Sequence, residues 1–221
     1  MEIGSVIQQI IISIIPILFA VILHEVSHGY VAYRLGDPTA KMMGRLTLNP
    51  ISHIDIFGTI LIPLFLYIAT DGQFVFGYAK PVPINPYNFR NPKRDMAISA
   101  AAGPVTNLLL AAACVILWKH VISPLSLVAP DMNTTFFDPL KSLLAVGVTI
   151  NVVLAVFNMI PIPPLDGGRV LMGILPYRQA AALSRLERYG FMIVILLAAT
   201  GIANFLIIPV IRLIIDILSL L

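Results

Sequence analysis

Long apolar runs separated by short polar stretches dominate the chain. Residues 5–23 contain no charged side chain and lead directly into a polar cluster at residues 24–28. Such runs are typical of helices that cross a bilayer, whose hydrocarbon core needs about 20 residues of helix. The pattern predicts helices over residues 5–35, 55–70 and 95–118, from near 141 to a break at Pro161, and over 189–221 with a bend near Gly201 or Pro209.

The segments between these helices contain turn-forming and helix-breaking residues. The first helix is expected to end at Gly36-Asp37-Pro38, and residues 39–51 alternate weakly, which predicts a short strand or β-hairpin at the interface. Ser52 and Asp55 have the spacing of a capping box, which is typical of a helix start. Residues 71–94 contain four prolines and are predicted to be extended or looped, because proline removes a backbone donor.

Composition places the chain among membrane proteins. It is 58% hydrophobic and 11% charged, with a mean hydropathy of +0.93, which is far too apolar for a soluble domain of 221 residues. The first apolar run lacks a basic start and a cleavage site, so we expect it to stay in the mature protein. Cys114, the single cysteine, is expected to be a packing residue. We predict an all-α polytopic membrane protein, one domain over 1–221, with about five to six transmembrane helices and no nucleic-acid partner.

Basic residues mark the expected cytoplasmic side. By the positive-inside rule, short loops rich in lysine and arginine face the cytoplasm. Of the 14 such residues, 11 fall into three segments, 34–45, 80–94 and 169–188. The loop 119–141 contains only Lys119 and Lys141, with two aspartates and three prolines, and is expected to face outside. The distribution predicts a multi-pass protein of the cell membrane.

Counting crossings predicts a re-entrant segment. The first helix ends inside and the segment 80–94 is also inside, so a full crossing by residues 55–70 leaves only residues 71–79 for the return. Fully extended, that stretch would span about 32 Å, barely the ~30 Å hydrocarbon core, with unpaired backbone in lipid. We therefore expect residues 55–87 to enter and leave on one side. The stretch Gln73-Phe74-Val75-Phe76 would be extended and could pair with an unwound substrate.

His24, Glu25 and His28 form an H-E-x-x-H pattern at the end of the first apolar run. On a helix, histidines four residues apart project from one face and can reach a single tetrahedral zinc ion. Glu25 then lies beside the metal, where it can take a proton from activated water. Ionisable groups at membrane depth cost free energy unless they are paired or bind a metal. The pattern therefore favours a functional site, and the alternative, a polar contact that only joins helices, is less favoured.

Three further polar residues are candidates for the site or its surroundings. Asp166 follows Pro161-Ile162-Pro163-Pro164 and is the only other carboxylate placed to join the two histidines; its alternative role is to cap the next helix. Asn107 is a polar side chain at membrane depth, where it could join helices through a hydrogen bond. His53 is expected to be an interfacial residue and not a ligand.

Four motifs can be compared with known families: HEVSHGYVAYRLGDPTA, GRLTLNP, AAGPVTN and FNMIPIPPLDGGR. Together they resemble the site-2 protease family of intramembrane zinc metalloproteases, in its short prokaryotic form without PDZ or CBS domains. The resemblance implies that His24, His28 and Asp166 bind one Zn²⁺. It further implies that Glu25 is the catalytic base and that Asn107 lies near the scissile carbonyl, where it could donate to the oxyanion.

The expected function is hydrolysis of a peptide bond within or near the transmembrane segment of a single-pass membrane protein, toward the cytoplasmic side of the bilayer. A zinc or proton transporter could use the same histidines and aspartate, because such residues also mark ion pathways, but it would not need Glu25 as a base. A non-catalytic membrane scaffold would keep the fold without needing all four groups of the site.

Overall fold

A computed structural model describes the chain apart from residues 1–2, 72–76 and 200. The described residues form helices and connecting segments, with no strand among them. The α-helices are α1 (Ile3–Arg34), α2 (Thr39–Met42), α3 (Ile62–Ala69), α4 (Pro92–Leu117), α5 (Ser123–Val128), α6 (Asp138–Asn158), α7 (Asp166–Ile174), α8 (Tyr177–Ser184), α9 (Glu187–Ala199) and α10 (Ile202–Leu218). Short 3₁₀ and π turns between them are η1 (Pro50–His53), η2 (Ile56–Leu61), η3 (Pro86–Asn88), η4 (Trp118–Ile122), η5 (Pro130–Met132) and η6 (Asn133–Phe137).

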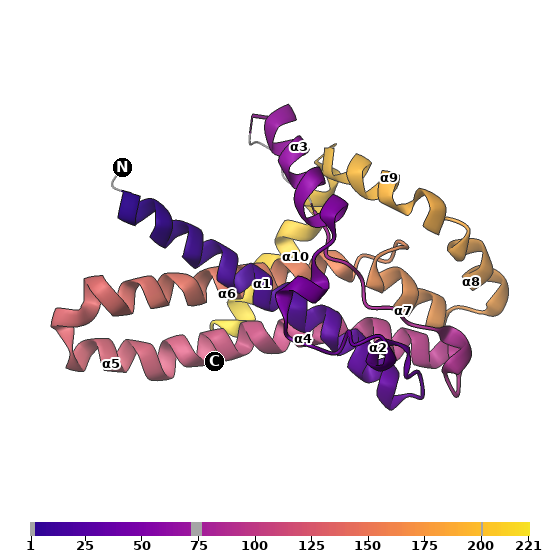
Figure 1. Ribbon diagram of the computed structural model, residues 1–221, viewed down its shortest axis with the longest axis horizontal. Coiled ribbons are helices and arrows are strands. Elements are labelled where there is room, and N and C mark those ends of the chain that lie inside the picture. Colours follow the sequence, from indigo (N-terminus) through magenta and orange to yellow (C-terminus); the bar gives the residue numbers. More distant parts are fainter. Residues whose placement is uncertain (1–2, 72–76, 200) are drawn as a thin grey trace.

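Three long helices, α1, α4 and α6, form the frame of the molecule. α4 and α6 run side by side along its long axis and α1 crosses them, while α7 packs on α4 and α10 on α6 (Figure 1). Ala111 of α4 is fully buried in a cluster with Val148 and Val152 of α6. Small residues allow helices to approach this closely. Cys114 packs against the same cluster, so its expected role in packing is confirmed.

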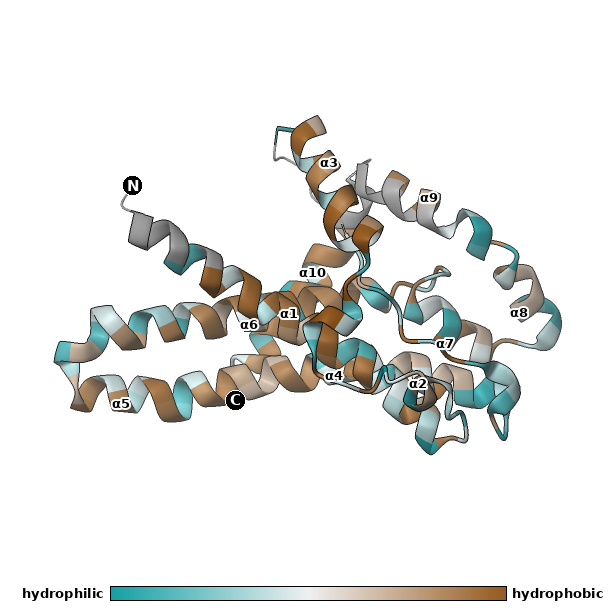
Figure 2. Ribbon diagram, in the orientation of Figure 1, coloured by the Kyte–Doolittle hydropathy of each residue, from teal (hydrophilic) through white to brown (hydrophobic). Residues whose placement is uncertain are grey.

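Helical stretches long and apolar enough to cross a membrane are Ile11–Arg34, Pro92–Val128 and Pro130–Asn158. Hydrophobic residues recur along the length of these helices (Figure 2). This count of three covers only the described part of the chain, and the expected five to six helices are not confirmed. The predicted loop at 119–141 is wrong, because helical structure continues through η4 and α5. Its prolines lie in the first turns of successive segments, where a missing N–H is tolerated.

The short β-hairpin predicted within residues 39–51 is not confirmed. The segment begins with the single helical turn of α2, which is followed by Gly44 in the left-handed conformation at φ +66°. It ends in the 3₁₀ turn η1. A hairpin needs backbone pairing with a second strand, but the backbone here bonds locally: the Gly44 N–H donates to the Lys41 carbonyl over 3.0 Å and the Arg45 N–H to the Ala40 carbonyl over 2.9 Å. Weak alternation in so short a segment was not enough to establish strand pairing.

η2 and α3 form an arm that projects away from the frame (Figure 1). The helix starts near the predicted position, but Asp55 itself is the cap, with its carboxylate accepting from the Gly58 N–H at 2.7 Å. No residue of α3 is buried, and its exposed side chains are apolar, including Phe65 and Ile68. The arm therefore offers its apolar surface to its surroundings.

The chain returns from this arm to the point where it left. The Tyr78 N–H donates to the Gly58 carbonyl over 3.0 Å, and the Lys80 N–H to the His53 carbonyl over 2.9 Å. The two ends of the excursion therefore lie side by side, as a re-entrant segment requires. The predicted extended edge at residues 73–76 lies outside the described residues.

The C-terminal stretch bends at Gly201, one of the two positions expected. This residue has φ +74°, a left-handed conformation that favours glycine, and separates α9 from α10. α10 continues through Pro209. Its end lies beside η4, where the His120 Nε2 is 2.7 Å from the Leu221 carbonyl oxygen.

Candidate metal centre

Two imidazoles from α1 and one carboxylate from α7 meet in the interior. His24 and His28, four residues apart on one face of α1, have their Nε2 atoms 3.0 Å apart. Asp166 Oδ2 lies 3.1 Å from His24 Nε2 and 3.3 Å from His28 Nε2. Within the described part of the chain, this is the group of three side chains that could hold a metal ion. The three residues predicted as ligands are therefore brought together.

The route of the chain into α7 explains how Asp166 reaches the histidines. A proline-rich turn leads from the end of α6 to Leu165, the N-cap of α7, which makes no side-chain capping bond. A Cβ at Gly167 would lie 2.2 Å from the Met159 carbonyl oxygen, and one at Gly168 would lie 2.3 Å from the backbone of the turn. Only glycine fits these two positions. Asp166 Oδ2 faces the histidines, so its alternative role as a helix cap is not supported.

Hydrogen bonds set which nitrogen of each histidine faces the site. His28 Nδ1 lies 2.7 Å from the Ser99 carbonyl oxygen. Because a carbonyl can only accept, Nδ1 carries the hydrogen and Nε2 presents a lone pair. The Ser99 hydroxyl donates back to the His28 carbonyl over 3.0 Å, which ties α1 to α4. His24 makes the corresponding contact to a side chain, with Nδ1 2.6 Å from Asn107 Oδ1.

The donor set fits zinc. Zinc–nitrogen distances of about 2.0–2.1 Å in a tetrahedral site place neighbouring ligand atoms about 3.3 Å apart, and the three separations here are 3.0, 3.1 and 3.3 Å. Asp166 Oδ2 is buried and, in the described structure, accepts no hydrogen bond. A buried acceptor that faces two nitrogen lone pairs is stable only if a cation or proton lies among them.

The backbone of α4 closes one side of the cluster at Gly103. A Cβ there would lie 2.4 Å from His28 Nε2 and 2.6 Å from His24 Nε2. A side chain at this position would displace the two rings, so glycine is required for their arrangement.

Glu25 lies next to the cluster but has a different partner. Its Oε2 accepts a hydrogen bond from the Val82 N–H over 2.8 Å, and it is not one of the three grouped side chains. Val82 belongs to the segment 77–85, which returns from the arm without regular secondary structure. Glu25 is therefore beside the candidate metal position and not part of it, as expected of a base.

Asn107 of α4 lies behind His24 and bonds to two other helices, α1 and α6. Its side chain is fully buried, with Oδ1 on His24 and Nδ2 donating to the Ala20 carbonyl at 3.2 Å and to Asn151 Oδ1 at 2.8 Å. Both amide hydrogens are thus engaged, which favours the interhelical role over donation to an oxyanion. Sequence reasoning assigned no role to Asn151, although an asparagine within an apolar helix was a signal for one.

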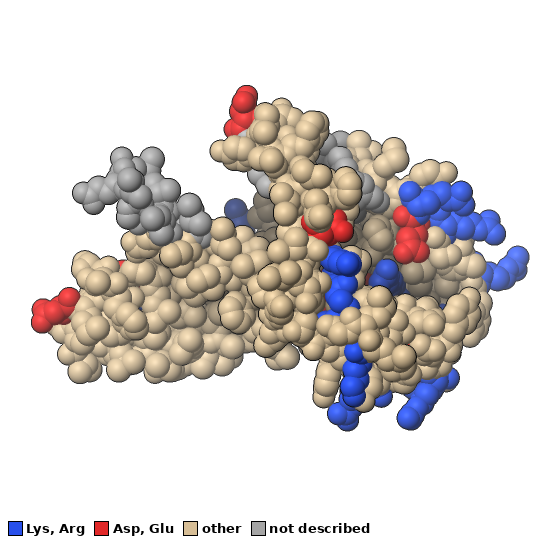
Figure 3. Space-filling view, viewed as in Figure 1, with Lys and Arg blue, Asp and Glu red and all other residues tan. Residues whose placement is uncertain are grey.

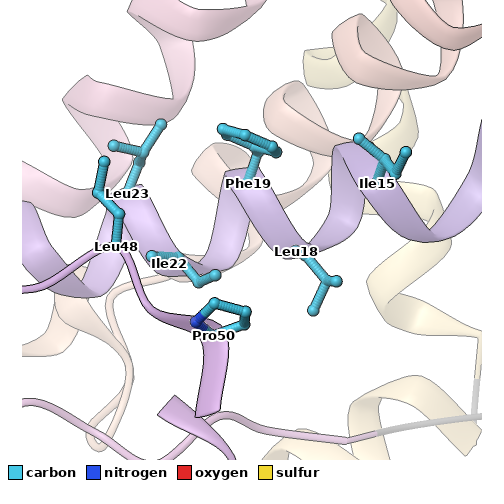
Figure 4. A pocket seen from close by; sticks show the side chains of 7 residues that line it. All are labelled: Ile15, Leu18, Phe19, Ile22, Leu23, Leu48 and Pro50. Atoms are coloured by element: carbon cyan, nitrogen blue, oxygen red, sulfur yellow. The ribbon is translucent and has the colours of Figure 1, made fainter. Parts of the chain in front are cut away.

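Two other features lie away from the cluster. His53 is buried, with Nε2 2.8 Å from the Thr47 carbonyl oxygen, and is not a member of the group. A cavity of about 220 Å³ lies between one face of α1 and the segment at Leu48 and Pro50 (Figure 4). Its lining includes Ile22, which precedes His24 by two residues. At about 100° per residue, its side chain lies about 200° around the helix axis from that of His24, on nearly the opposite side of α1. The cavity therefore faces away from the candidate ligands.

The chain matches known proteins over most of its length. The model of "Peptidase family M50" matches residues 12–123 and 116–201. "Putative zinc metalloprotease YwhC" of Bacillus subtilis is 36% identical over 199 residues, which are 90% of this chain and 85% of that protein. "Putative zinc metalloprotease Rip2" of Mycolicibacterium smegmatis is 29% identical over 85% of this chain, and that of Mycobacterium tuberculosis 30% over 83%; the matches cover 66% and 65% of those proteins. No solved structure matches significantly.

A buried group of two histidines and one aspartate between long apolar helices agrees with the family match and with the names of the related proteins. The chain therefore belongs to peptidase family M50, the zinc-dependent site-2 protease family.

Proposed function

We propose that this protein is an intramembrane zinc metalloprotease that hydrolyses a peptide bond within or near the transmembrane segment of a single-pass membrane protein. The observation that carries the proposal is the position of the His24, His28 and Asp166 cluster among helices long enough to cross a membrane. Ionisable groups enclosed in this way are typical of functional sites at membrane depth.

Each site residue has a role that its geometry supports. His24, His28 and Asp166 hold one Zn²⁺, and three protein ligands are the number typical of catalytic zinc sites. When bound, the ion polarises the scissile carbonyl and lowers the pKa of water to about 7. Glu25 removes the proton of the attacking water and delivers it to the leaving amine. The Val82 N–H holds Glu25 Oε2, which leaves Oε1 to carry that proton.

The segment that returns from the arm and passes beside Glu25 is proposed to guide the substrate to the cluster. A helical substrate shields its peptide bonds, so the segment to be cut must unwind and its backbone groups need new partners. The predicted pairing edge at residues 73–76 is proposed to supply them by strand pairing. The N–H groups of Tyr78, Lys80 and Val82 in the following segment are already engaged within the protein. This arrangement would bring the scissile bond next to the cluster.

The site is proposed to face the cytoplasm. Figure 3 shows lysine and arginine side chains gathered at the end of the molecule that carries α2, α7 and α8. The positive-inside rule assigns this end to the cytoplasmic side of the cell membrane. α1 ends there at Arg34, six residues or about 9 Å beyond His28.

The test compares the wild type with Glu25→Gln, using purified protein in liposomes and a set of transmembrane peptides whose products are identified by mass spectrometry. We expect the wild type to cleave and Glu25→Gln to show no cleavage while keeping its zinc, because the substitution removes the base and no ligand. Glu187→Gln, at an exposed position on α9, is the matched control.

Cleavage by Glu25→Gln at the wild-type rate would contradict the proposed mechanism. Zinc entry into the liposomes that persists in this variant would favour a transporter, for which the described residues provide no supporting observation.

A further inference from the structure

Two buried asparagines connect three helices to one of the candidate ligands. Asn151 of α6 accepts from Asn107 of α4 over 2.8 Å, and Asn107 Oδ1 lies 2.6 Å from His24 Nδ1 on α1. The exposed fractions are 4% for Asn151 and 0% for Asn107. Polar groups so far from water remain only where each has a partner, so the direction of every hydrogen bond in this chain is constrained.

Backbone carbonyls fix the direction of these hydrogen bonds, beginning at Asn151, the asparagine farther from His24. The Gly147 carbonyl lies 2.8 Å from Asn151 Nδ2, and because a carbonyl only accepts, the nitrogen must face it. Asn151 Oδ1 then faces Asn107 and requires a donor there. Asn107 Nδ2 donates to it and to the Ala20 carbonyl, which is also an acceptor. Asn107 Oδ1 is thereby turned toward His24.

The consequence for His24 is a single tautomer. Facing an oxygen acceptor, its Nδ1 must carry the hydrogen, which leaves a lone pair on the Nε2 that faces Asp166. If the Asn107 amide were reversed, its NH₂ group would face Nδ1. The ring would then accept at Nδ1 and carry its hydrogen on Nε2, where it cannot bind a metal.

We propose that Asn151 is a positioning residue for the metal centre, which acts through Asn107 to hold His24 in the tautomer that binds zinc. The inference rests on the proposed function, because it concerns the same zinc ligands.

The two histidines differ in what holds them. His28 Nδ1 is fixed directly by the Ser99 carbonyl, which no side-chain substitution removes. His24 depends on the Asn107 side chain, whose orientation is set jointly by Asn151 and by the Ala20 carbonyl. Loss of an outer partner of a metal-binding histidine typically weakens metal binding about 10- to 100-fold. Substitution at Asn151 should therefore affect zinc affinity without touching any ligand.

The experiment measures zinc affinity by competition with a chelator and the visible absorption of the cobalt-substituted protein, both on the full chain in detergent. Asn151→Leu keeps a similar volume but removes both hydrogen-bonding groups. Asn151→Asp, protonated in this apolar setting, can still donate to Gly147 and accept from Asn107. Thr149→Val is the matched control, because Thr149 is exposed and its hydroxyl bonds to the Ala145 carbonyl of its own helix.

We expect Asn151→Leu to bind zinc about 10-fold more weakly, at the low end of the range for a direct partner because Ala20 still holds Asn107, and to show a changed cobalt spectrum. Asn151→Asp and Thr149→Val should remain close to the wild type. Wild-type affinity and an unchanged spectrum in folded Asn151→Leu would overturn the proposal. Should that variant not fold, Asn151→Ala is measured in its place and judged by the same outcomes.

Failure of this inference can be told apart from failure of the proposed function. If the wild type binds zinc and Asn151→Leu binds it equally well, only the positioning role is excluded. If the wild type binds no zinc, the proposed function itself fails.

Discussion

The two candidate histidine ligands pack so closely against the backbone of α4 that position 103 has room for the hydrogen atom of glycine but not for a side chain. The local spacing of His24 and His28 could be predicted from the sequence, because a helix places residues four apart on one face. The need for glycine opposite them could not, because it arises only when α4 packs against α1. The same holds for Asn107, whose three partners belong to α1 and α6.

We predict that Gly103→Ala abolishes or strongly weakens zinc binding. The new Cβ would lie 2.4–2.6 Å from both imidazoles, so the rings must move away from Asp166. Overpacking of this kind typically also costs about 1–3 kcal/mol of stability. Ala113→Val, at an exposed position on the same helix, is the control. Metal analysis of both purified variants gives the answer, and a full zinc content in Gly103→Ala would show that the rings can adjust.

At the level of whole elements, the segment 77–85 and the following turn η3 are anchored to the end of α1 through Asp37. This side chain is fully buried, with Oδ2 accepting from the Asn85 N–H at 2.7 Å and Oδ1 from Asn88 Nδ2 at 2.8 Å. Burial would raise the pKa of this carboxyl, but the hydrogen bonds from Asn88, Thr39 and Asn85 outweigh it, and the pKa lies below its usual range. The sequence indicated only a helix end at Asp37, because two of its partners, Asn85 and Asn88, lie far along the chain.

Asp37→Asn should lower the melting temperature, because an amide cannot accept on both sides and hydrogen bonds to a charged group contribute about 1.5–3 kcal/mol each. Asp131→Asn, an exposed position in η5, should have little effect. Since folding lowers the pKa of Asp37, the advantage of the wild type should be complete above the usual aspartate value of about 3.9 and disappear as the pH falls below it. Thermal unfolding in detergent across this range tests both statements, and equal melting temperatures at pH 7 would contradict them.

The helix boundaries in residues 119–141 were predicted wrongly, because proline is compatible both with a loop and with the first turn of a helix. The three prolines in 119–141 suggested a loop, yet in the structure they lie within the first turns of α5, η5 and α6. Proline is disfavoured inside a helix but tolerated in its first turn, and the sequence alone did not distinguish these positions.

On the scale of the whole molecule, the arm formed by η2 and α3 decides how many times the chain crosses the bilayer. Its two ends meet at Gly58 and Tyr78. The crossing count made from charges and chain lengths predicted such a return. It could not predict the direction of the arm, which depends on the Asp55 cap and the packing of the Tyr78 ring beside Gly58.

We predict that Asp71→Cys, in a Cys114→Ser background, is not labelled by a membrane-impermeant thiol reagent from outside. Asp71 follows α3, and a re-entrant arm does not carry it across the bilayer. Val128→Cys, at an exposed position at the end of α5, should react from outside, and Met43→Cys, also exposed, only from the cytoplasmic side. Labelling of Asp71→Cys from outside alone would require a full second crossing.

The central claim is that His24, His28 and Asp166 together hold one catalytic zinc ion per chain. The most direct measurement is the zinc content of purified wild-type protein, Asp166→Ala and Glu25→Gln by mass spectrometry of the metal. We predict about one zinc per chain in the wild type and in Glu25→Gln, and a large loss in Asp166→Ala, which retains only two of the three ligands. One zinc per chain in Asp166→Ala would contradict the assignment of this cluster as the metal centre.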